Sequence, residues 1–311
     1  MPTVLITGGT GLIGKNLTSH LINRRYNVVI LTRKPVTNKT KEGITYATWD
    51  IEKPQIDNDA IAKADYIIHL AGAGVMDKRW TADYKKEIAE SRTKSGHLIV
   101  NALQQTNNKV KAIIAVSAIG WYGENPKQHL PAWDGFKESD WPDMGFLGTT
   151  CKLWEESIEP ATTLGKRLVK LRLGIVLSND GGAFVEFKKP IRFGIAAVLG
   201  NGEQVISWIH IDDVCRMFIY AIENENLSGS YNAVSPEPVS NKKLIIKTAD
   251  LMRKSFYIPV HVPNLFLKLF LGERSTEILK SATVSCDKIK RTGFTFLYPT
   301  LDAALGELIN K

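Results

Sequence analysis

Three glycines near the start of the chain have the spacing of a dinucleotide-binding turn. Gly8, Gly11 and Gly14 follow a short apolar run and open a segment whose apolar residues recur at helical spacing. The first glycine permits a tight turn, the second lets backbone N–H groups approach a pyrophosphate, and the third lets the helix lie close to the sheet. A helix N-terminus also favours the phosphate charge. We therefore expect cofactor contacts from Gly8, Thr10, Gly11, Leu12, Ile13 and Gly14; the alternative is a glycine-rich turn without a ligand.

Two basic residues after the second apolar run indicate which dinucleotide this turn would bind. A cofactor-binding unit of this kind often has Asp or Glu about 20 residues past the glycines, where the carboxylate holds the ribose 2′-OH of NAD. Here the chain has Arg33 and Lys34. A carboxylate would repel a 2′-phosphate, whereas a guanidinium can pair with it and stack on adenine. The pattern favours NADP(H) over NAD(H); the alternative is an ordinary solvated basic pair.

Lys78, Arg79 and Trp80 combine charge with a large aromatic ring. Arg79 and Trp80 could hold an anionic or planar part of a substrate. In the alternative interpretation, Asp77 and Lys78 cap the following helix and Trp80 packs beneath it. The sequence leaves both open, and the three residues are candidate substrate contacts.

Ser117 and Tyr122 are candidate catalytic residues in the segment after the fifth apolar run. Ser117 could hydrogen-bond a substrate carbonyl, and the phenol of Tyr122 could donate a proton. The alternatives are a turn hydroxyl for Ser117 and, for Tyr122, a buried ring whose hydroxyl is already hydrogen-bonded.

His210, Asp212 and Asp213 raise the question of a metal site. Strand-like alternation would place Trp208, His210 and Asp212 on one face. No second His or Cys is near in the sequence, so the ligand set is too small and we expect no metal. A helix follows this segment, and Asp212 is expected to cap it.

The elements that must position these residues alternate between strand and helix. Apolar runs at residues 4–6, 27–32, 45–49, 66–70, 112–116 and 169–173 are separated by helical segments such as residues 81–105. This pattern predicts an α/β fold with a doubly wound parallel sheet covered on both faces. Ligands in such sheets bind beyond the carboxyl ends of the strands, which adds five candidate cofactor contacts: Asp50, Leu70, Ala71, Gly72 and Gly74.

The regular alternation of strands and helices ends at about residue 180, and beyond it loops rich in Gly, Pro and Asn separate shorter elements. We expect a dinucleotide-binding Rossmann domain over residues 1–180 and a smaller substrate lobe over residues 181–311. Residues 204–226 are apolar enough to pack back on the first domain.

Composition narrows the possible partners. The chain has 311 residues and a formal net charge of +8, but its basic residues are dispersed, so nucleic-acid binding is not expected. The three cysteines are odd in number and far apart, which suits a reducing, cytoplasmic compartment. The apolar run at residues 265–271 is too short for a membrane span and predicts a packed helix. We expect a small-molecule substrate and a monomer or homodimer.

Several segments in register resemble the extended branch of the short-chain dehydrogenase/reductase superfamily, which includes sugar-nucleotide epimerases and dehydratases. Residues 7–14 match its glycine signature, residues 69–72 resemble the turn after its fourth strand, and residues 117–123 resemble its Ser-rich loop ending in Tyr-Gly. More narrowly, essentially the whole chain resembles the NAD-dependent or nucleoside-diphosphate-sugar epimerase family proteins. The segments that carry this narrower resemblance are residues 74, 77–80, 91–92, 117–123, 208–213, 232–239 and 293–294.

The resemblance implies a protein that moves a hydride at nicotinamide C4, and it adds candidate residues. Arg92 stands where extended members commonly have Asn and joins the candidate substrate contacts, as does Trp208. Active members use a Tyr and, four residues later on a helix, a Lys that lowers the pKa of the Tyr.

In the matching region the candidate lysine is Lys152, and the position four before it is Gly148, which cannot transfer a proton. Lys152 could still reach the nicotinamide ribose, or it could be a solvated helix lysine. The sequence predicts an NADP(H)-binding oxidoreductase or epimerase-like enzyme acting on a small carbonyl or sugar-nucleotide-like substrate. The alternative is a non-catalytic NADP(H)-binding sensor.

Overall fold

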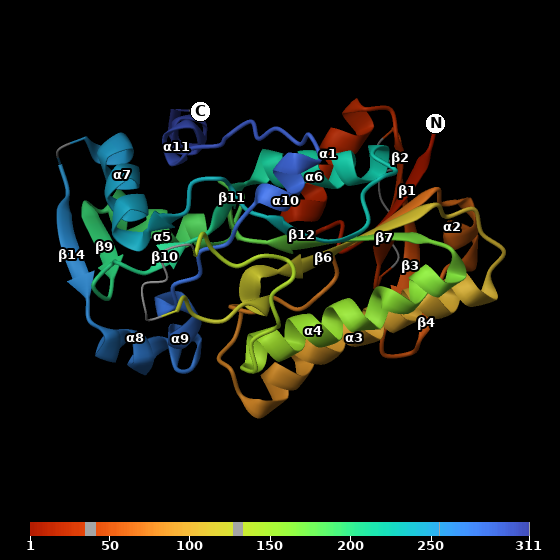
Figure 1. Ribbon diagram of the computed structural model, residues 1–311, viewed down its shortest axis with the longest axis horizontal. Helices are drawn as coiled ribbons and strands as arrows, with labels where there is room; N and C mark the ends of the chain where they lie inside the picture. The colour runs from red at the N-terminus through yellow and green to blue at the C-terminus, as the bar shows by residue number, and fades with distance from the viewer. Residues whose placement is uncertain (35–41, 127–132, 255, 311) are drawn as a thin grey trace.

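The computed structural model describes residues 1–34, 42–126, 133–254 and 256–310. Its centre is an eight-stranded sheet in the order β12-β7-β6-β5-β1-β2-β3-β4 (Figure 1). Every neighbouring pair is parallel except β3 and β4, which are antiparallel. The strands are β1 (Thr3–Thr7), β2 (Asn27–Thr32), β3 (Ile44–Asp50), β4 (Gln55–Ile56), β5 (Tyr66–His69), β6 (Ala112–Ala118), β7 (Arg167–Leu173) and β12 (Gly229–Ala233).

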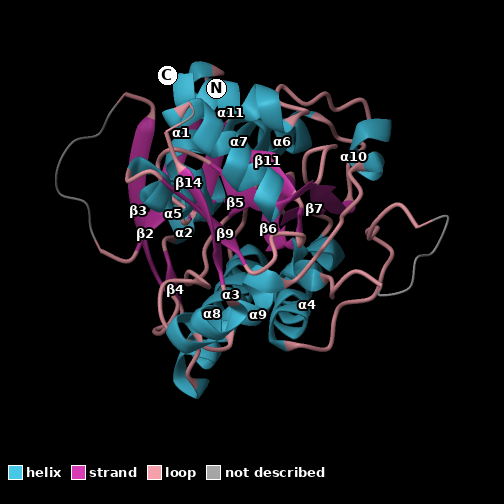
Figure 2. Ribbon diagram, turned by 90° about the vertical axis from the view of Figure 1, so that its left-hand side faces the viewer, coloured by secondary structure: helices cyan, strands magenta, loops and turns pink. Residues whose placement is uncertain are grey.

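Helices cover both faces of this sheet, as the near-continuous apolar strands require. On one face, α1 (Leu12–Asn23) and α6 (Ile211–Glu223) pack over a core that also includes β1, β6 and β7. On the other face lie α2 (Asn58–Lys63), α3 (Ala82–Gln105) and α4 (Phe146–Ile158). Figures 1 and 2 show α3 and α4 side by side along this second face. The predicted α/β class with a doubly wound parallel sheet is confirmed.

The strand register aligns the carboxyl ends of the central strands. Thr7 at the end of β1 pairs with Leu31 of β2 and His69 of β5, and His69 pairs in turn with Ala115 of β6. The short 3₁₀ helix η1 (Ile119–Trp121) follows β6 directly, and η2 (Glu159–Leu164) leads from α4 into β7. The loops after β1, β2, β3, β5 and β6 therefore meet along one edge of the sheet.

The smaller lobe is built from short elements around two apolar clusters. Its elements are β8 (Ile175–Leu177), α5 (Ala183–Arg192), β9 (Ile195–Leu199), β10 (Val205–Ile206), β11 (Trp208–His210), β13 (Val239–Ser240), α7 (Asn241–Arg253), β14 (Ile258–Val262), α8 (Asn264–Leu271), α9 (Arg274–Leu279) and α11 (Leu301–Asn310); α10 (Asp287–Arg291) lies against the first core. The return to the large sheet extends beyond the predicted residues 204–226, because β12 also pairs with β7.

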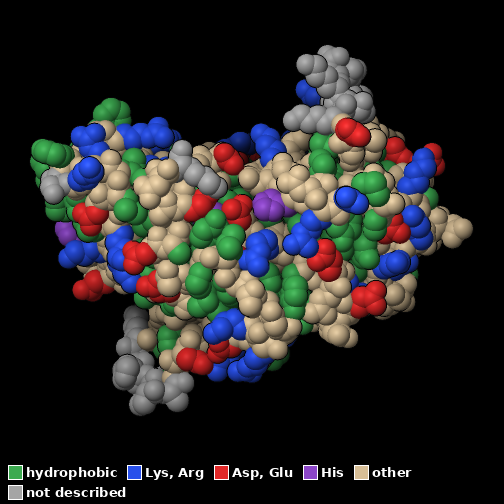
Figure 3. All heavy atoms as spheres, turned by 90° about the horizontal axis from the view of Figure 1, so that it is seen from above, with side chains coloured by type: hydrophobic (Ala, Val, Ile, Leu, Met, Phe, Trp, Pro, Cys, Tyr) green, Lys and Arg blue, Asp and Glu red, His purple; other side chains and the backbone are tan. Residues whose placement is uncertain are grey.

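The expectation of a packed helix at residues 265–271 is wrong in one respect. The helix forms as α8, but only Leu267 is buried, and Leu265, Phe266, Leu269 and Phe270 are between 53% and 76% exposed. None of the helices within the described ranges is long and apolar enough to cross a membrane. Figure 3 shows Lys and Arg side chains scattered among Asp and Glu over one face, in keeping with the dispersed charge of the sequence.

Candidate functional site

The turn between β1 and α1 depends on its glycines for space. Gly8 has φ +68°, and a Cβ there would lie 2.9 Å from the carbonyl carbon of Leu70. A Cβ on Gly14 would lie 2.5 Å from Cα of Gly9. A Cβ on Gly11 would meet only the carbonyl oxygen of Gly8, at 3.3 Å, so the outer side of Gly11 is open. The cradle is tight where the helix meets the sheet and open where a pyrophosphate would approach.

Gly11 is also the N-cap of α1, and its cap has no side-chain hydrogen bond. The backbone N–H groups of the first turn therefore remain available to an anion. The smaller lobe lies beside this turn: Asn16 donates to a carboxylate oxygen of Asp180 at 3.2 Å, and Leu12 is within 3.3 Å of where a Cβ on Gly182 would be. The cradle thus lies next to residues 180–182, where the chain leads into the smaller lobe.

A buried histidine fixes the turn after β5 against this cradle. The backbone N–H groups of Leu70 and Ala71 donate to the hydroxyl of Thr7, at 3.1 and 3.2 Å, and that hydroxyl lies 2.7 Å from Nδ1 of His69. Burial, reinforced by the nearby charge of Arg92, lowers the pKa of His69 to about 4. His69 is therefore neutral, and the Thr7 hydroxyl donates to it. Sequence reasoning missed this pair, although both are polar residues ending apolar strands.

The depressed pKa of His69 makes a pH-dependent stability prediction. The unfolded chain would protonate His69 below about pH 6.5, whereas the folded chain resists protonation until about pH 4. The stability that the neutral ring contributes is full above pH 6.5 and is lost as pH falls through this window, by about 3 kcal/mol in all. Urea unfolding at several pH values should show a steeper loss for the unmodified protein than for His69→Gln. Equal slopes would contradict the assignment.

The adenosine part of a bound dinucleotide would lie at the ends of β2 and β3. Arg33 is exposed directly after β2, and Lys34 accepts a hydrogen bond from Thr32 through its backbone carbonyl. Backbone N–H groups of Lys53 and Glu52 donate to Asp50 and lower the pKa of its carboxyl, and the charge of Arg33 acts in the same direction. A guanidinium and a carboxylate therefore lie near each other where the sequence predicted cofactor contacts.

The hydroxyls of Ser117 and Tyr122, the predicted catalytic residues, are both buried and already bonded within the protein. Ser117 donates to Oε1 of Glu155 at 2.8 Å. Tyr122 donates to Asn232 at 2.7 Å and accepts from Arg172 at 3.0 Å. The alternative stated for Tyr122, a buried ring whose hydroxyl is already hydrogen-bonded, describes that residue, whereas Ser117 lies within β6 and not in a turn.

The same hydrogen bonds belong to a buried ion pair that sequence reasoning missed. Nε and Nη2 of Arg172 donate to the two carboxylate oxygens of Glu155, at 2.8 and 3.1 Å, and both side chains are at most 5% exposed. Burial would raise the pKa of Glu155, but the hydrogen bonds and charge of Arg172 outweigh it and hold that pKa below its usual range. The pair joins α4 to β7 behind the loop that follows β6.

Lys152, the third predicted catalytic residue, points from α4 toward solvent, where it lies 3.8 Å from Glu156. The residues of α4 that face the loop after β6 are Leu147 and Cys151. Atoms of these two lie 3.3 and 3.6 Å from where a Cβ on Gly120 would be. Their spacing of four residues is that of the Tyr–Lys pair, so the inward pair is one position earlier than Gly148 and Lys152.

Cys151 offers little acid–base chemistry in this position. Burial raises the pKa of its thiol to about 12, so the group stays protonated near neutral pH. Leu147 carries no proton to transfer. The face of α4 that would hold the catalytic pair of an active family member therefore has neither a phenol nor an ammonium group.

Three of the predicted substrate contacts are engaged within the protein. Trp80 donates its indole N–H to the carbonyl of Val75 at 2.8 Å, and Lys78 pairs with Glu87 at 3.1 Å. Trp208 is fully buried and donates to the carbonyl of Glu237 at 2.7 Å. This arrangement does not support their predicted substrate roles, since the two indole N–H groups are hydrogen-bonded to backbone carbonyls and Lys78 is paired with Glu87.

The two arginines predicted as substrate contacts, Arg79 and Arg92, both donate hydrogen bonds to backbone carbonyls of the protein. Arg92 is buried and donates through Nη1 to the carbonyl of Ala73 at 3.0 Å, beneath Gly72. Arg79 donates to the carbonyl of Leu269 in α8 at 2.9 Å, and Arg274 of α9 donates back to Met76 at 2.8 Å. An ion pair between Lys85 and Glu273 adds a third link. These contacts join the loop after β5 and the start of α3 to α8 and α9.

A cavity of about 360 Å³ lies against α8 and α9. Lys280 lines it and donates to the backbone carbonyl of Tyr122 at 3.1 Å, so the cavity adjoins the loop after β6. The other lining residues are Glu124, Asn264, Lys268, Ser275, Thr276, Glu277 and Leu279. Its size suits a small molecule.

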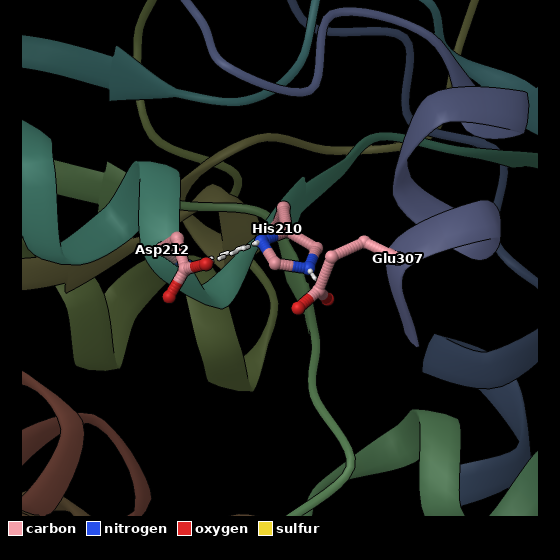
Figure 4. A group of neighbouring side chains, drawn as sticks. All are labelled: His210, Asp212 and Glu307. Carbon is pink, nitrogen blue, oxygen red and sulfur yellow. Dashed lines mark hydrogen bonds and ion pairs between the residues drawn. The ribbon is translucent and has the colours of Figure 1, made fainter. Parts of the chain in front are cut away.

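The segment around His210 is a helix cap. His210, not Asp212, is the N-cap of α6, because the helix already begins at Ile211. Its Nδ1 accepts from the backbone N–H of Asp212 at 3.2 Å. Figure 4 shows its ring between the carboxylates of Asp212 and Glu307, with Nε2 3.0 Å from Glu307. Ligand atoms of the three residues lie within 4.8 Å of one another. A neutral ring that accepts at Nδ1 carries its hydrogen at Nε2, so neither nitrogen offers a lone pair to a metal ion.

Comparison with known proteins gives matches along the whole chain. Residues 4–139 match the NAD dependent epimerase/dehydratase family, and residues 262–308 match a domain of unknown function, DUF1731. Epimerase family protein SSP1921 of Staphylococcus saprophyticus is 36% identical over 312 residues, and SAR0825 of Staphylococcus aureus is 34% identical over 311; both alignments cover 100% of each chain.

Solved structures agree with these matches. The human epimerase family protein SDR39U1, solved with NADPH, is 27% identical, has a TM-score of 0.87 and is covered to 99%, as is this chain. A nucleoside-diphosphate sugar epimerase from Corynebacterium glutamicum is also 27% identical, with a TM-score of 0.76; the match covers 99% of this chain and 58% of that one. UDP-glucose 4-epimerase from Thermotoga maritima, at 20% identity and TM-score 0.77, shows the shared fold.

Proposed function

This chain belongs to the epimerase family of extended short-chain dehydrogenase/reductase-like, NAD(P)-binding proteins, and from that premise we propose that it binds NADP(H) at the glycine turn between β1 and α1. The observation that carries the proposal is the glycine cradle, open at Gly11, with Arg33 at the neighbouring strand end. A human relative with 27% identity was solved with NADPH, which supports the same choice.

The residues that would hold the cofactor lie at the aligned strand ends. The first turn of α1 would hold the pyrophosphate, and Arg33 the 2′-phosphate, since a guanidinium can pair with phosphate through two hydrogen bonds. Asp50 and the turn after β5 would complete the adenosine and ribose contacts. The full set is Gly8, Thr10, Gly11, Leu12, Ile13, Gly14, Arg33, Lys34, Asp50, Leu70, Ala71, Gly72 and Gly74.

We propose a hydride-transfer function for the bound cofactor, which supplies the hydride at its nicotinamide ring. The chain's own residues contribute the walls: the loop after β6 with Gly120, and Leu147 and Cys151 of α4. The cavity beside Tyr122 would take a small carbonyl or sugar-nucleotide-like substrate. With no phenol on α4, the proton at the substrate oxygen would come from water or from the substrate itself.

A second candidate function is a non-catalytic NADP(H)-binding sensor. The inward pair of Leu147 and Cys151 favours it, because Leu147 has no proton to transfer and burial makes the Cys151 thiol a weaker acid than an ordinary phenol. A panel of carbonyl compounds and sugar nucleotides, followed by NADPH absorbance, separates the two functions. Turnover with any member supports an enzyme, whereas tight NADPH binding without turnover across the panel supports a sensor.

Replacing Arg33 tests the choice of cofactor. Losing a charge-assisted contact costs about 1.5–3 kcal/mol, so Arg33→Asp should weaken NADPH more than about tenfold and leave NADH binding nearly unchanged. Calorimetric titration measures both affinities. Arg192→Asp, the same charge change at an exposed residue of α5, is the matched control and should change neither. An equal loss for both cofactors in Arg33→Asp would contradict the role of Arg33.

A further inference from the structure

One end of the smaller lobe exposes many large apolar side chains, and we name it the β14–α8 face. Nine residues make it up, with exposures from 42% to 83%: Phe193, Ile195, Phe256, Ile258, Val260, Leu265, Phe266, Leu269 and Phe270. They come from β9, β14, α8 and the residues that lead into the two strands. Figure 2 looks directly at this end, with β9 and β14 near the centre and α8 below them.

The strand part of the face follows from the register of β9 and β14. Pro259 pairs with Ala196 and His261 with Val198, and both of these β9 residues pack in the cluster that includes Ile191, Ile245 and Ala249 of α5 and α7. Ile258 pairs with Ile195, so these two point to the opposite face together with Val260. There they are exposed. Helices α5 and α7 therefore cover Ala196 and Val198 of β9 on one face, whereas Ile195, Ile258 and Val260 on the other face are exposed. Pro259 and His261 of β14 are exposed as well.

The helix part continues the face without a break in the chain. Pro263 directly follows β14 and is the N-cap of α8, whose eight residues are apolar except for Asn264 and Lys268. A helix that is apolar nearly all round is normally covered. In α8, only Leu267 is buried in the chain itself.

The size of the face matches what a stable dimer needs. Taking about 200 Å² for a fully exposed large apolar side chain, nine residues at these exposures present on the order of 1,000 Å². The largest apolar patch of a typical monomer is about 300–600 Å², and a standard interface buries about 800 Å² per partner. The β14–α8 face exceeds the first value and reaches the second.

We propose that the β14–α8 face joins two copies of this chain in a symmetric dimer. Symmetric pairing brings the same apolar surface of both copies together, which is the commonest arrangement of soluble homo-oligomers. Packing is face to face, not strand to strand: Ile258 donates to the carbonyl of Gly194, the residue before β9, so alternation points the backbone nitrogen of Pro259 to the open edge, where it has no hydrogen to give.

A lipid surface fits the face less well. Helices that bind anionic membranes combine an apolar face with a polar face rich in Lys and Arg. Lys268 is the only basic residue of α8. A dimer would also hold α8 in place, and α8 accepts the hydrogen bond from Arg79 of the loop after β5.

Analytical ultracentrifugation of the full chain between about 1 and 100 µM tests the proposal. The unmodified protein should sediment at twice its chain mass of 34.6 kDa. In Phe266→Ser/Phe270→Ser, two interface anchors are lost and the dimer dissociation constant should rise at least about 100-fold. The variant should keep its melting temperature as a monomer, since both side chains are exposed within the chain.

The matched control is Trp141→Ser/Met144→Ser, which removes side chains that are 90% and 96% exposed outside the face. It should remain a dimer. A monomeric unmodified protein at 100 µM would overturn the proposal, and so would an α8 variant that dimerises as tightly as the control. A monomer that co-sediments with vesicles of phosphatidylcholine and phosphatidylglycerol would assign the face to lipid and would also overturn it.

Discussion

Gly11→Val is expected to abolish NADPH binding with only a modest loss of stability. Gly11 has φ −77°, a value that other residues adopt, and a Cβ there meets only the carbonyl oxygen of Gly8, at 3.3 Å. The branched side chain would instead occupy the open side of the cradle, where the pyrophosphate must approach backbone N–H groups. Thermal unfolding with and without NADPH measures the effect: the stabilisation by NADPH should disappear.

Gly306→Val is the matched control for this experiment. Gly306 lies in α11 with no atom within 4 Å of where its Cβ would be, so the same substitution should leave the NADPH-induced shift intact. Gly14→Val should behave differently from both, because its side chain would collide with Gly9 and destabilise the fold itself. Full stabilisation of Gly11→Val by NADPH would mean that the cofactor binds elsewhere.

Glu155→Gln is expected to cost the largest amount of stability among single substitutions near the site, about 3 kcal/mol. The substitution removes the charge that neutralises Arg172, and Arg172 is only 3% exposed. Breaking a buried ion pair from one side typically costs 3–5 kcal/mol, because the remaining charge is left in a poorly solvated place. Ser117 and Ser230, which also donate to Glu155, lose a charged acceptor.

Urea unfolding at neutral pH measures this loss, and Glu156→Gln is its control. Glu156 is the next residue of α4, is 57% exposed and lies 3.8 Å from Lys152, so its substitution should change stability by less than about 0.5 kcal/mol. Equal effects at the two positions would contradict the view that the buried pair holds α4 against β7.

The strands and the cradle could be predicted because their signals are local. The apolar run at residues 27–32 coincides with β2, and the glycines at 8, 11 and 14 need only the strand before them and the helix after them to be interpreted. Contacts between elements had no such signal. Two neighbouring positions on α4 differ by about 100° around the helix axis, so choosing Lys152 in place of Cys151 turned the predicted face to solvent.

The other differences between the predictions and the structure also come from contacts between elements, which leave no local signal in the sequence. Tyr122 looked available as an acid, but its partners Asn232 and Arg172 lie more than 40 residues away along the chain. Asp212 was expected to continue a strand and cap the next helix, yet the helix begins two residues earlier than that, at Ile211, and His210 caps it. The signal that could have found the buried pair was a charged residue in an apolar strand, since Arg172 interrupts the run at residues 169–173.

The central claim, that this family member selects NADP(H), is tested most directly by calorimetric titration of the unmodified protein with NADPH and with NADH under the same conditions. Arg33 at the end of β2 predicts that NADPH binds at least about tenfold more tightly than NADH, through pairing with the 2′-phosphate. Equal affinities for the two cofactors, or tighter binding of NADH, would contradict it.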